Sequence, residues 1–249
     1  MDRIDPFPKL HRGMLRRRDY FNIGHADLVL VNSRFMSKSI HRIYGINPEV
    51  NYLGVDTGTF HRLPVERERF LLSVGSLTPL KGFDFLVESI ACIPEPDRPP
   101  LVIVCNFSNP PETAYLRNLA REKSVELRLM ENVSEDQLVR LYNGAALVVY
   151  SPVREPFGFV PLEAMACGTP VVAVHEGGVG ESVVDGKTGL LVERDPLQFA
   201  TAVRRIMNGS GKLADDLGRN GRTHVEQQWN WERSVSAVER HLSDCAGRN

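Results

Sequence analysis

The sequence lacks the short patterns by which metal centres and common hydrolases are usually recognised. Its seven histidines are scattered over 249 residues, and no HxH, HExxH or DxD pattern is present. The GxSxG turn of a serine hydrolase and the GxxxxGK[ST] phosphate loop are absent as well. We therefore expect no metal site and no resident cofactor.

Cysteine and long apolar runs are also scarce. The four cysteines are Cys92, Cys105, Cys167 and Cys245, and no two of them form a CxxC pair. Buried, reduced thiols are the expected state. No apolar run approaches the ~20 residues of a membrane span, and the first ten residues, MDRIDPFPKL, hold no signal-peptide core. We expect a cytoplasmic protein.

The sequence also lacks an excess of charge of either sign. Lys and Arg number 30 and Asp and Glu 31, so the net charge of −1 gives no reason to expect nucleic acid as a partner. The cluster Arg16, Arg17 and Arg18 suits a solvated surface, and membrane-headgroup contact is the alternative. The hydrophobic content of 42% suits a globular protein, and the length of 249 residues allows one large domain or two small ones.

From residue 69 onward, short apolar runs alternate with amphipathic stretches. FLLSVGSL, LVIVC, VELRLM, ALVVYS, TPVVAVH and TGLLVE read as strands, with helical stretches between and after them. The strands are apolar on both faces, which is typical of a parallel sheet covered by helices. The sequence therefore predicts a Rossmann-like, doubly wound α/β sheet, whose ligands bind at the carboxyl ends of the strands.

The two ends of the chain show less regularity. ADLVLVNS reads as a strand, and Ser33 is expected to cap a helix that runs to about Tyr44. One strand and one helix cannot close a domain, so this part reads as the end of another α/β unit or an extra layer. A further amphipathic helix is expected in WNWERSVSAVERHLSD.

The stretch EPFGFVPLE, residues 155–163, follows a strand and leads into a helix. Pro161 suits the first turn of that helix, which places Glu163 near its third position. Free backbone N–H groups at the helix start, with Gly158 among them, favour an anion such as phosphate. Glu163 could simply cap the helix. Alternatively, Glu155 and Glu163 flank a diphosphate and accept hydrogen bonds from sugar hydroxyls, as a nucleotide sugar requires.

Two further loops are expected at the same edge of the sheet. In GSLTPLKGFDFL, Lys81 lies at a helix start, where a bound anion would offset its conflict with the helix dipole; an exposed lysine is the alternative. In HEGGVGES, Gly177 and Gly178 predict a flexible loop without side chains, and Glu181 suits the first turn of a short helix. His175 is interpreted as a strand-end histidine.

In this combination the sequence closely resembles the C-terminal half of GT-B glycosyltransferases, specifically the retaining enzymes of family 4. The E-x7-E motif of that family falls on Glu155 and Glu163, within EPFGFVPLEAMACGTPVV. LVNSRFMSKSI, GVDTGTF, LLSVGSLTPLKGFDFLVES and EGGVGESVVDGKTGLLV also match, and the resemblance spans about residues 27–240. It implies a remnant of an N-terminal acceptor domain in residues 1–50, a nucleotide-sugar-binding domain in 51–228 and a crossing helix in 229–249.

The resemblance also implies site residues. Glu155 and Lys81 would be catalytic, with Glu155 on the donor sugar and Lys81 on the diphosphate, and Glu163 would bind the ribose. The remaining donor-binding residues would be Gly75, Ser76, Asn132, Val133, Phe157, Gly158 and Phe159. Ser76 stands where relatives often have an arginine, and Gly180 stands where many have a proline.

The expected activity is retaining transfer of a hexose from a UDP- or GDP-linked donor to an unknown acceptor hydroxyl, without metal. The alternative is a donor-binding half or truncated fragment that needs a separate acceptor-domain chain. A nucleotide-dependent oxidoreductase is disfavoured, because GGVGE is a poor match to the dinucleotide fingerprint. With little of the acceptor domain present, we expect the C-terminal helix to have an exposed or dimerised apolar side.

Overall fold

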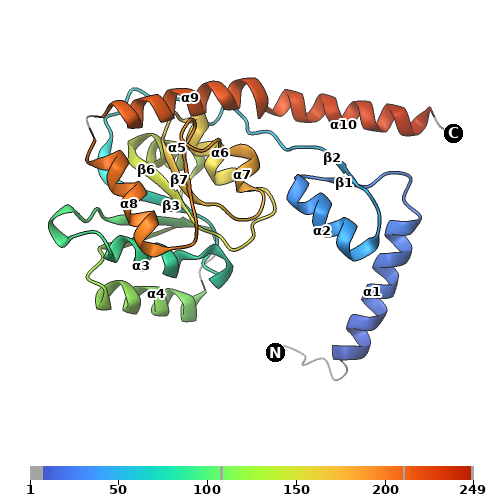
Figure 1. Ribbon diagram of the computed structural model, residues 1–249, viewed down its shortest axis with the longest axis horizontal. Coiled ribbons are helices and arrows are strands. Elements are labelled where there is room, and N and C mark those ends of the chain that lie inside the picture. The colour runs from blue at the N-terminus through green and yellow to red at the C-terminus, as the bar shows by residue number, and fades with distance from the viewer. Residues whose placement is uncertain (1–7, 107–108, 210, 248–249) are drawn as a thin grey trace.

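The computed structural model describes residues 8–106, 109–209 and 211–247, with side chains from residue 13 onward. Its largest unit is a six-stranded parallel sheet with the strand order β5-β4-β3-β6-β7-β8 (Figure 1). The strands are β3 Glu68–Val74, β4 Leu101–Cys105, β5 Leu127–Glu131, β6 Ala145–Tyr150, β7 Val171–Val174 and β8 Leu190–Val192. The chain turns back between β3 and β6, so the Rossmann-like, doubly wound fold is confirmed.

Helices cover both faces of this sheet. The larger elements are α3 Phe83–Ala91, α4 Pro110–Glu122, α5 Glu135–Gly144, α6 Phe159–Ala166, α8 Pro196–Met207 and α9 Lys212–Gln228. The short ones are the 3-10 helices η1 Pro79–Lys81 and η2 Glu95–Asp97 and the four-residue helix α7 Val179–Ser182. One apolar core lies between the sheet and α3, α4 and α8, and a second lies between the sheet and α5 and α6. Strands buried on both faces explain their continuous apolar sequences.

Local capping signals predicted helix starts well. Ser33 caps α2 Arg34–Tyr44 through the backbone N–H of Met36, and Asp195 caps α8 through that of Gln198. Ser134 caps α5 with the reciprocal bond from Gln137, and the sequence SEDQ, with its serine and glutamine three positions apart, predicts this capping box. These signals are readable because each depends on residues at most three positions apart.

Other expectations were wrong. Helix α6 begins at Phe159 with Gly158 as its N-cap, so Glu163 is the fifth residue of the helix and not near the third. Pro161 still lies in the first turn, as expected. Two helices, α1 Pro8–Gly24 and α9, were not predicted. The sequence of α1 has no clear apolar stripe, whereas α9 has one but carries two glycines, Gly218 and Gly221, which disfavour a helix locally.

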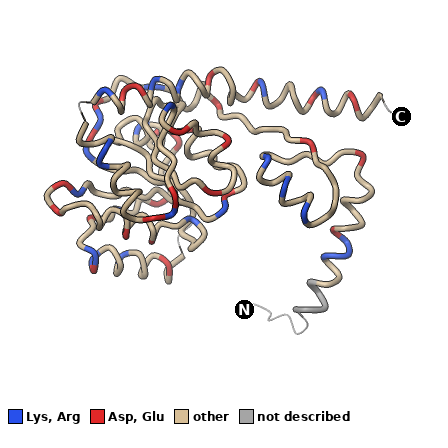
Figure 2. The backbone as a smooth tube through the Cα atoms, viewed as in Figure 1, with Lys and Arg blue, Asp and Glu red and all other residues tan. Residues whose placement is uncertain are grey.

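The N-terminal segment, residues 8–50, lies beside the main sheet (Figure 1). It holds α1, α2 and the two-residue strands β1 Leu30–Val31 and β2 Glu49–Val50, which pair in parallel. This agrees with the expectation that one strand and one helix cannot close a domain. Basic residues mark α2 along the backbone tube, whereas residues of both signs are interspersed over the main sheet and its helices (Figure 2).

The last helix, α10 Trp231–Ala246, extends away from the main sheet, over the N-terminal segment (Figure 1). Its start is fixed, because Val55 donates its backbone N–H to the carbonyl of Trp229 at 2.8 Å. Beyond that point Trp231, Val235 and Leu242 are exposed. The expected exposure of apolar side chains on the C-terminal helix is thereby confirmed.

Candidate active site

Three loops meet where β3, β6 and β7 end. The first carries Lys81, the second carries Glu155, and their charged groups form an ion pair with 2.7 Å between Nζ and Oε2. Only 26% and 23% of these two side chains is exposed. The structure therefore brings together the two residues that were predicted to be catalytic.

Glycine at position 82 allows the first two loops to lie against each other. Gly82 has a left-handed backbone with φ of 64°, and a Cβ there would lie 2.2 Å from the carbonyl oxygen of Ser151. The Ser151 hydroxyl donates to the carbonyl of Gly82 at 2.8 Å, and the backbone N–H of Val153 donates to that of Leu80 at 2.8 Å. Such close packing fixes Lys81 opposite Glu155.

The glycine pair of the third loop is a packing requirement and not a flexible hinge. A Cβ on Gly177 would lie 2.1 Å from the carbonyl oxygen of Glu155, and one on Gly178 would lie 2.2 Å from that of Pro156. The backbone N–H of Gly178 donates to the Glu155 carbonyl at 2.8 Å. The predicted flexibility is thus corrected: these glycines let the second loop pack tightly on the third.

Arg194 and Glu176 brace the second loop, and sequence reasoning missed both. The Arg194 guanidinium donates to the Glu176 carboxylate from Nε at 2.7 Å and to the carbonyls of Ser151 and Pro152 from Nη2 at 3.0 Å each. The hydrogen bond from Arg194 holds the pKa of Glu176 below its ordinary value. No local pattern could show this pairing, because 18 positions separate the two residues.

Glu163 lies deeper, under α5. Its Oε2 accepts a hydrogen bond of 2.5 Å from the hydroxyl of Tyr142, which is fully buried. Burial raises the pKa of Glu163, and the bond from Tyr142 opposes that shift. Within the described residues, no side-chain hydrogen bond caps the start of α6, which argues against the capping interpretation of Glu163.

A cavity of about 450 Å³ opens beside Glu163. Its lining comes from the ends of β3 and β4, from the start of α5 and from α6: Phe60, Val74, Gly75, Ser76, Val104, Asn106, Val133, Glu135, Leu138, Val160 and Glu163. Four of the expected donor-binding residues, Gly75, Ser76, Val133 and Glu163, thus line one cavity. Asn132 precedes Val133 with a left-handed φ of 53°. The Lys81 side chain connects the ion pair to the cavity, because it passes next to Gly75 in the cavity lining. A Cβ built on Gly75 would lie 3.4 Å from the Lys81 Cδ.

The residues Phe157, Gly158 and Phe159 form the turn into α6. Phe157 is buried, with its ring centroid 5.2 Å from that of Phe159 and 5.8 Å from that of Trp229. Gly158 has a left-handed φ of 92°. Within the described ranges, the backbone N–H groups of Gly158 and Phe159 have no acceptor. The helix start thus offers two free donors toward an anion.

Tyr150 lies directly beneath this turn and was also missed. Its hydroxyl would be 3.2 Å from a Cβ on Gly158, and the side chain is 3% exposed. Burial, and then the charges of Glu155 and Glu163, raise its pKa above the ordinary value. The phenol therefore stays protonated and can only be a donor or a neutral acceptor at this site.

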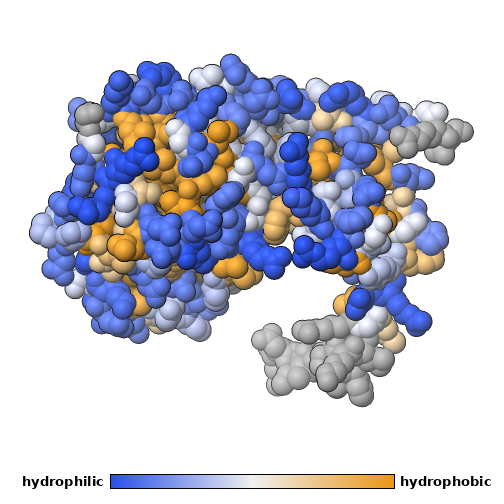
Figure 3. All heavy atoms as spheres, viewed as in Figure 1, coloured by the Kyte–Doolittle hydropathy of each residue, from blue (hydrophilic) through white to orange (hydrophobic). Residues whose placement is uncertain are grey.

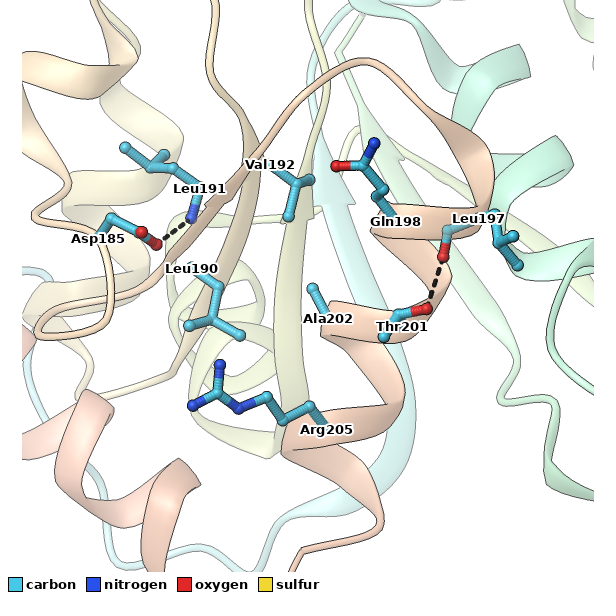
Figure 4. Close-up of a pocket in the computed structure, with 9 residues that line it drawn as sticks. All are labelled: Asp185, Leu190, Leu191, Val192, Leu197, Gln198, Thr201, Ala202 and Arg205. Atoms are coloured by element: carbon cyan, nitrogen blue, oxygen red, sulfur yellow. Dashed lines mark hydrogen bonds between the residues drawn. The ribbon is translucent and has the colours of Figure 1, made fainter.

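A second cavity of about 430 Å³ lies between β8 and α8, away from these loops (Figure 4). Apolar side chains gather on this side of the molecule (Figure 3). Asp185 accepts there from the backbone N–H of Leu191 and Thr201 donates to the carbonyl of Leu197, and Gln198 and Arg205 add two more polar side chains to the lining. None of the expected donor-binding residues lines this second cavity, whereas four of them line the cavity beside Glu163, which is therefore the candidate active site.

Two further features of the described residues concern metal binding and membrane insertion. In residues 8–106, 109–209 and 211–247, no group of three or more His, Cys, Asp or Glu side chains is placed to hold a metal ion. In the same ranges no helix has the length and apolar character needed to cross a membrane. Metal independence and location remain predictions.

The doubly wound sheet, with its candidate site at the point where the strand order reverses, defines a Rossmann-like α/β protein. Residues 59–224 match the family model for glycosyl transferases group 1. The chain belongs to this family, and the resemblance stated from the motifs is confirmed.

Individual relatives agree with this membership. D-inositol 3-phosphate glycosyltransferase 2 of Catenulispora acidiphila is 32% identical over 241 residues, which cover 87% of this chain and 56% of the relative. Human alpha-1,3/1,6-mannosyltransferase ALG2 is 24% identical over 261 residues, which cover 94% and 62%. The chain thus spans little more than half the length of the curated relatives it matches.

Solved structures give the same fold. Sucrose-phosphate synthase from Thermosynechococcus elongatus superposes with a TM-score of 0.81 at 26% identity, covering 93% of this chain and 62% of that one. Anabaena HepE in complex with UDP-glucose superposes with a TM-score of 0.79 at 22% identity, covering 88% and 64%. The latter likeness, at this identity, concerns the fold alone.

Proposed function

We propose that this chain binds a nucleotide-diphosphate sugar and forms the donor side of a retaining hexosyltransferase acting on an acceptor hydroxyl. One observation carries the proposal: Lys81 and Glu155 form an ion pair beside the free N–H groups of the α6 start, and Glu163 lines the adjoining cavity. This arrangement supplies cationic, N–H and carboxylate partners for the parts of a nucleotide sugar.

The diphosphate would lie against Lys81 and the backbone N–H groups of Gly158 and Phe159. A phosphate there would gain charge-assisted hydrogen bonds from the ammonium and from a helix start that carries partial positive charge. The same groups would stabilise the negative charge that develops on the leaving nucleoside diphosphate. We propose that they do so without a metal ion.

The nucleoside would occupy the cavity of about 450 Å³. Glu163 can accept hydrogen bonds from two ribose hydroxyls, because the bond from Tyr142 occupies only one of its lone-pair positions. Asn132 and Val133 would border the base. Gly75 and Ser76, at the end of β3, would leave room for the phosphates, with Ser76 as a weaker substitute for an arginine.

Glu155 would bind hydroxyls of the donor sugar and place its anomeric carbon. In transfer, the bond between that carbon and the diphosphate oxygen would break, and the acceptor oxygen would bond to the carbon from the same face, which retains the configuration. The proton of the acceptor hydroxyl would pass to the departing diphosphate oxygen. Since Lys81 is paired with Glu155 in this structure, we propose that the diphosphate takes over the ammonium and leaves Glu155 to the sugar.

A second proposal is that the chain binds the donor but needs a separate acceptor-domain chain for transfer. The observation in its favour is the size of the N-terminal segment, in which the described residues form two helices and two two-residue strands. Transfer by the purified chain to a water or alcohol acceptor would favour the first form of the proposal. Donor binding without transfer would favour the second.

We further propose a cytoplasmic protein whose N-terminal segment can meet another surface. Arg16, Arg17 and Arg18 are exposed on α1 together with Met14 and Phe21. Peripheral membrane contact through these residues is one proposal, and contact with an acceptor-domain chain or a second copy is the other. Vesicle flotation with and without anionic lipid distinguishes them.

Titration calorimetry tests the donor site directly. The wild-type chain is titrated with UDP, GDP and ADP, each with and without EDTA. We expect binding of at least one nucleoside diphosphate, UDP or GDP, that EDTA does not change. Thermal shift across UDP-, GDP- and ADP-sugars then identifies the donor. If the chain binds none of the three diphosphates, the proposed function is wrong.

A further inference from the structure

Glu181 joins the N-terminal segment to the rest of the molecule. It lies on α7, yet both of its carboxylate oxygens accept hydrogen bonds from the start of α2. The backbone N–H of Arg34 donates to Oε2 and that of Phe35 to Oε1, each at 2.8 Å. The Tyr52 hydroxyl also donates to Oε2, again at 2.8 Å. The side chain thus serves α2, and not its own helix as the sequence suggested.

These bonds complete the start of α2. The first four N–H groups of a helix have no partner inside it. In α2, the regular bonding begins at Ser37, whose N–H donates to the Ser33 carbonyl at 2.9 Å, and Met36 donates to the Ser33 hydroxyl at 3.0 Å. The donors of Arg34 and Phe35, which precede them, are satisfied by Glu181, which is 147 and 146 residues away. Moving α2 off α7 would leave both without a protein partner.

The contact is charged as well as hydrogen-bonded. A carboxylate at a helix start is favoured by the partial positive charge there. Burial first, and then the bond and charge of Glu181, raise the pKa of Tyr52 to about 12. The Tyr52 phenol therefore remains a donor to Glu181 throughout the physiological range.

The same contact reaches the loop that carries Glu155. Glu181 lies three positions after Gly178, whose backbone N–H is bonded to the Glu155 carbonyl. From the other side, the guanidinium carbon of Arg154 lies 5.8 Å from the ring centroid of Phe35. The first turn of α2 is therefore connected to residues 154 and 155 along two routes.

We propose that Glu181 is a positioning residue that holds the N-terminal segment against the loop carrying Glu155. The proposal rests on the proposed function only where it assigns Glu155 to the donor sugar. Because coupling between two sites is reciprocal, a ligand that orders this loop also favours docking of α2, and loss of the Glu181 contact weakens both.

Amide hydrogen exchange tests the contact without any nucleotide. The wild type is compared with Glu181→Ala, Glu181→Gln and Glu193→Gln; the Glu193 side chain is exposed and has no hydrogen bond or ion pair within the described residues. In Glu181→Ala we expect exchange at Arg34 and Phe35 to be about tenfold faster or more, since two charge-assisted bonds are lost. Glu181→Gln should lie between, and Glu193→Gln should match the wild type. Unchanged exchange in Glu181→Ala would overturn the proposal.

The second readout is the loop itself. Residues 153–158 should also exchange faster in Glu181→Ala, whereas α4, which lies away from both sites, should not. Faster exchange confined to α2 would show a local cap with no positioning role and would likewise overturn the proposal. A melting temperature measured for each variant separates these local effects from general loss of the fold.

A double-mutant cycle with Tyr52→Phe checks that the contact is direct. Tyr52→Phe should speed exchange at Arg34 in the wild type and have little effect in the Glu181→Ala background. Additive effects would contradict the direct contact.

Adding UDP or GDP then tests the coupling: a bound nucleotide should slow exchange at Phe35 in the wild type and not in Glu181→Ala. Failure of the wild type to bind either nucleotide would refute the donor site and leave the first comparison intact.

Discussion

The ammonium of Lys81 lies 2.7 Å from the carboxylate of Glu155, although 74 positions separate the two residues. Glu155 thus occupies the position where a phosphate would bind Lys81, and Lys81 occupies the position where a sugar hydroxyl would bind Glu155. A diphosphate would have to displace Glu155 from Lys81, whereas a complete nucleotide sugar offers both groups a partner. This relationship leads to the first prediction.

Removing either member of the pair should change nucleotide affinity in opposite directions. Lys81→Met should weaken nucleoside diphosphate binding by about tenfold to a hundredfold, the loss of one charge-assisted bond. Glu155→Gln should tighten it by about fivefold, because a competitor for Lys81 is removed. Calorimetry measures both, with Lys187→Met, an exposed lysine, as control. Equal affinities in the wild type and Lys81→Met would contradict the assignment.

Replacing Glu163 should raise stability while lowering affinity. Burial raises its pKa above the ordinary 4.5, so the folded protein holds this proton more tightly than the unfolded chain does. The stabilisation that the protonated Glu163 carboxyl provides is therefore complete below the ordinary pKa of 4.5. It is lost as the pH rises through the higher pKa of the folded protein. At pH 7, Glu163→Gln should raise the melting temperature by about 2–4 °C, as ~1 kcal/mol would do.

The same variant should weaken nucleotide binding by about tenfold or more, because a ribose hydroxyl loses a charged acceptor. Tyr142→Phe serves as the comparison: it loses the bond to Glu163 and should lower the melting temperature. A Glu163→Gln protein with unchanged affinity would refute the ribose role. An unchanged or lower melting temperature at pH 7 would refute the stability effect.

Two glycines with similar backbone angles should respond differently to alanine. Gly177 and Gly186 have φ of 66° and 69°, so both substitutions carry the same left-handed strain, about 1–2 kcal/mol. A Cβ on Gly177 would overlap the Glu155 carbonyl, whereas nothing lies within 4 Å of one on Gly186. Gly177→Ala should therefore lose more stability in urea unfolding and also lose nucleotide affinity. Equal losses in the two variants would contradict the packing role of Gly177.

His224 should make stability depend on pH. Its Nε2 lies 2.9 Å from the donating Nε1 of Trp229, and burial lowers its pKa below the ordinary 6.5. The folded protein then resists protonation of His224, so the stabilisation from the neutral imidazole is complete above the ordinary pKa of 6.5. It is lost as the pH falls through the lower pKa of the folded protein. Urea unfolding at pH 7.5 and 5.5 should show this loss, and His224→Gln should lose less between the two. An equal loss in both would exclude His224 as the cause.

The exposed stripe on α10 should drive self-association. Trp231, Val235 and Leu242 lie on one face of the helix, four and then seven positions apart, and all are exposed. We expect a concentration-dependent dimer by light scattering, and Val235→Glu with Leu242→Glu should shift it toward monomer. Arg233→Glu, on another face of α10, is the control. A wild type that stays monomeric at high concentration would count against this prediction.

Patterns within a few residues determined much of what the sequence revealed. Apolar strands gave the parallel sheet, and the capping residues Ser33, Ser134 and Asp195 marked three helix starts, because these signals depend on neighbouring backbone groups. The spacing of Glu155 and Glu163 around glycine and proline identified the candidate site. Local patterns failed for α1, which has no clear apolar stripe, for α9, whose glycines Gly218 and Gly221 disfavour a helix, and for the start of α6.

Only the tertiary structure decided how distant residues meet. The pairing of Lys81 with Glu155, the brace from Arg194, the packing of Gly177 and the bonds from Glu181 to α2 each join residues from different loops or helices. Such contacts depend on where whole elements come to lie when the two apolar cores are packed, and short-range sequence signals do not contain that information. The sequence predicted several candidate site residues and missed Tyr150, Glu176 and Arg194, because the position of each of those three depends on how the loops pack.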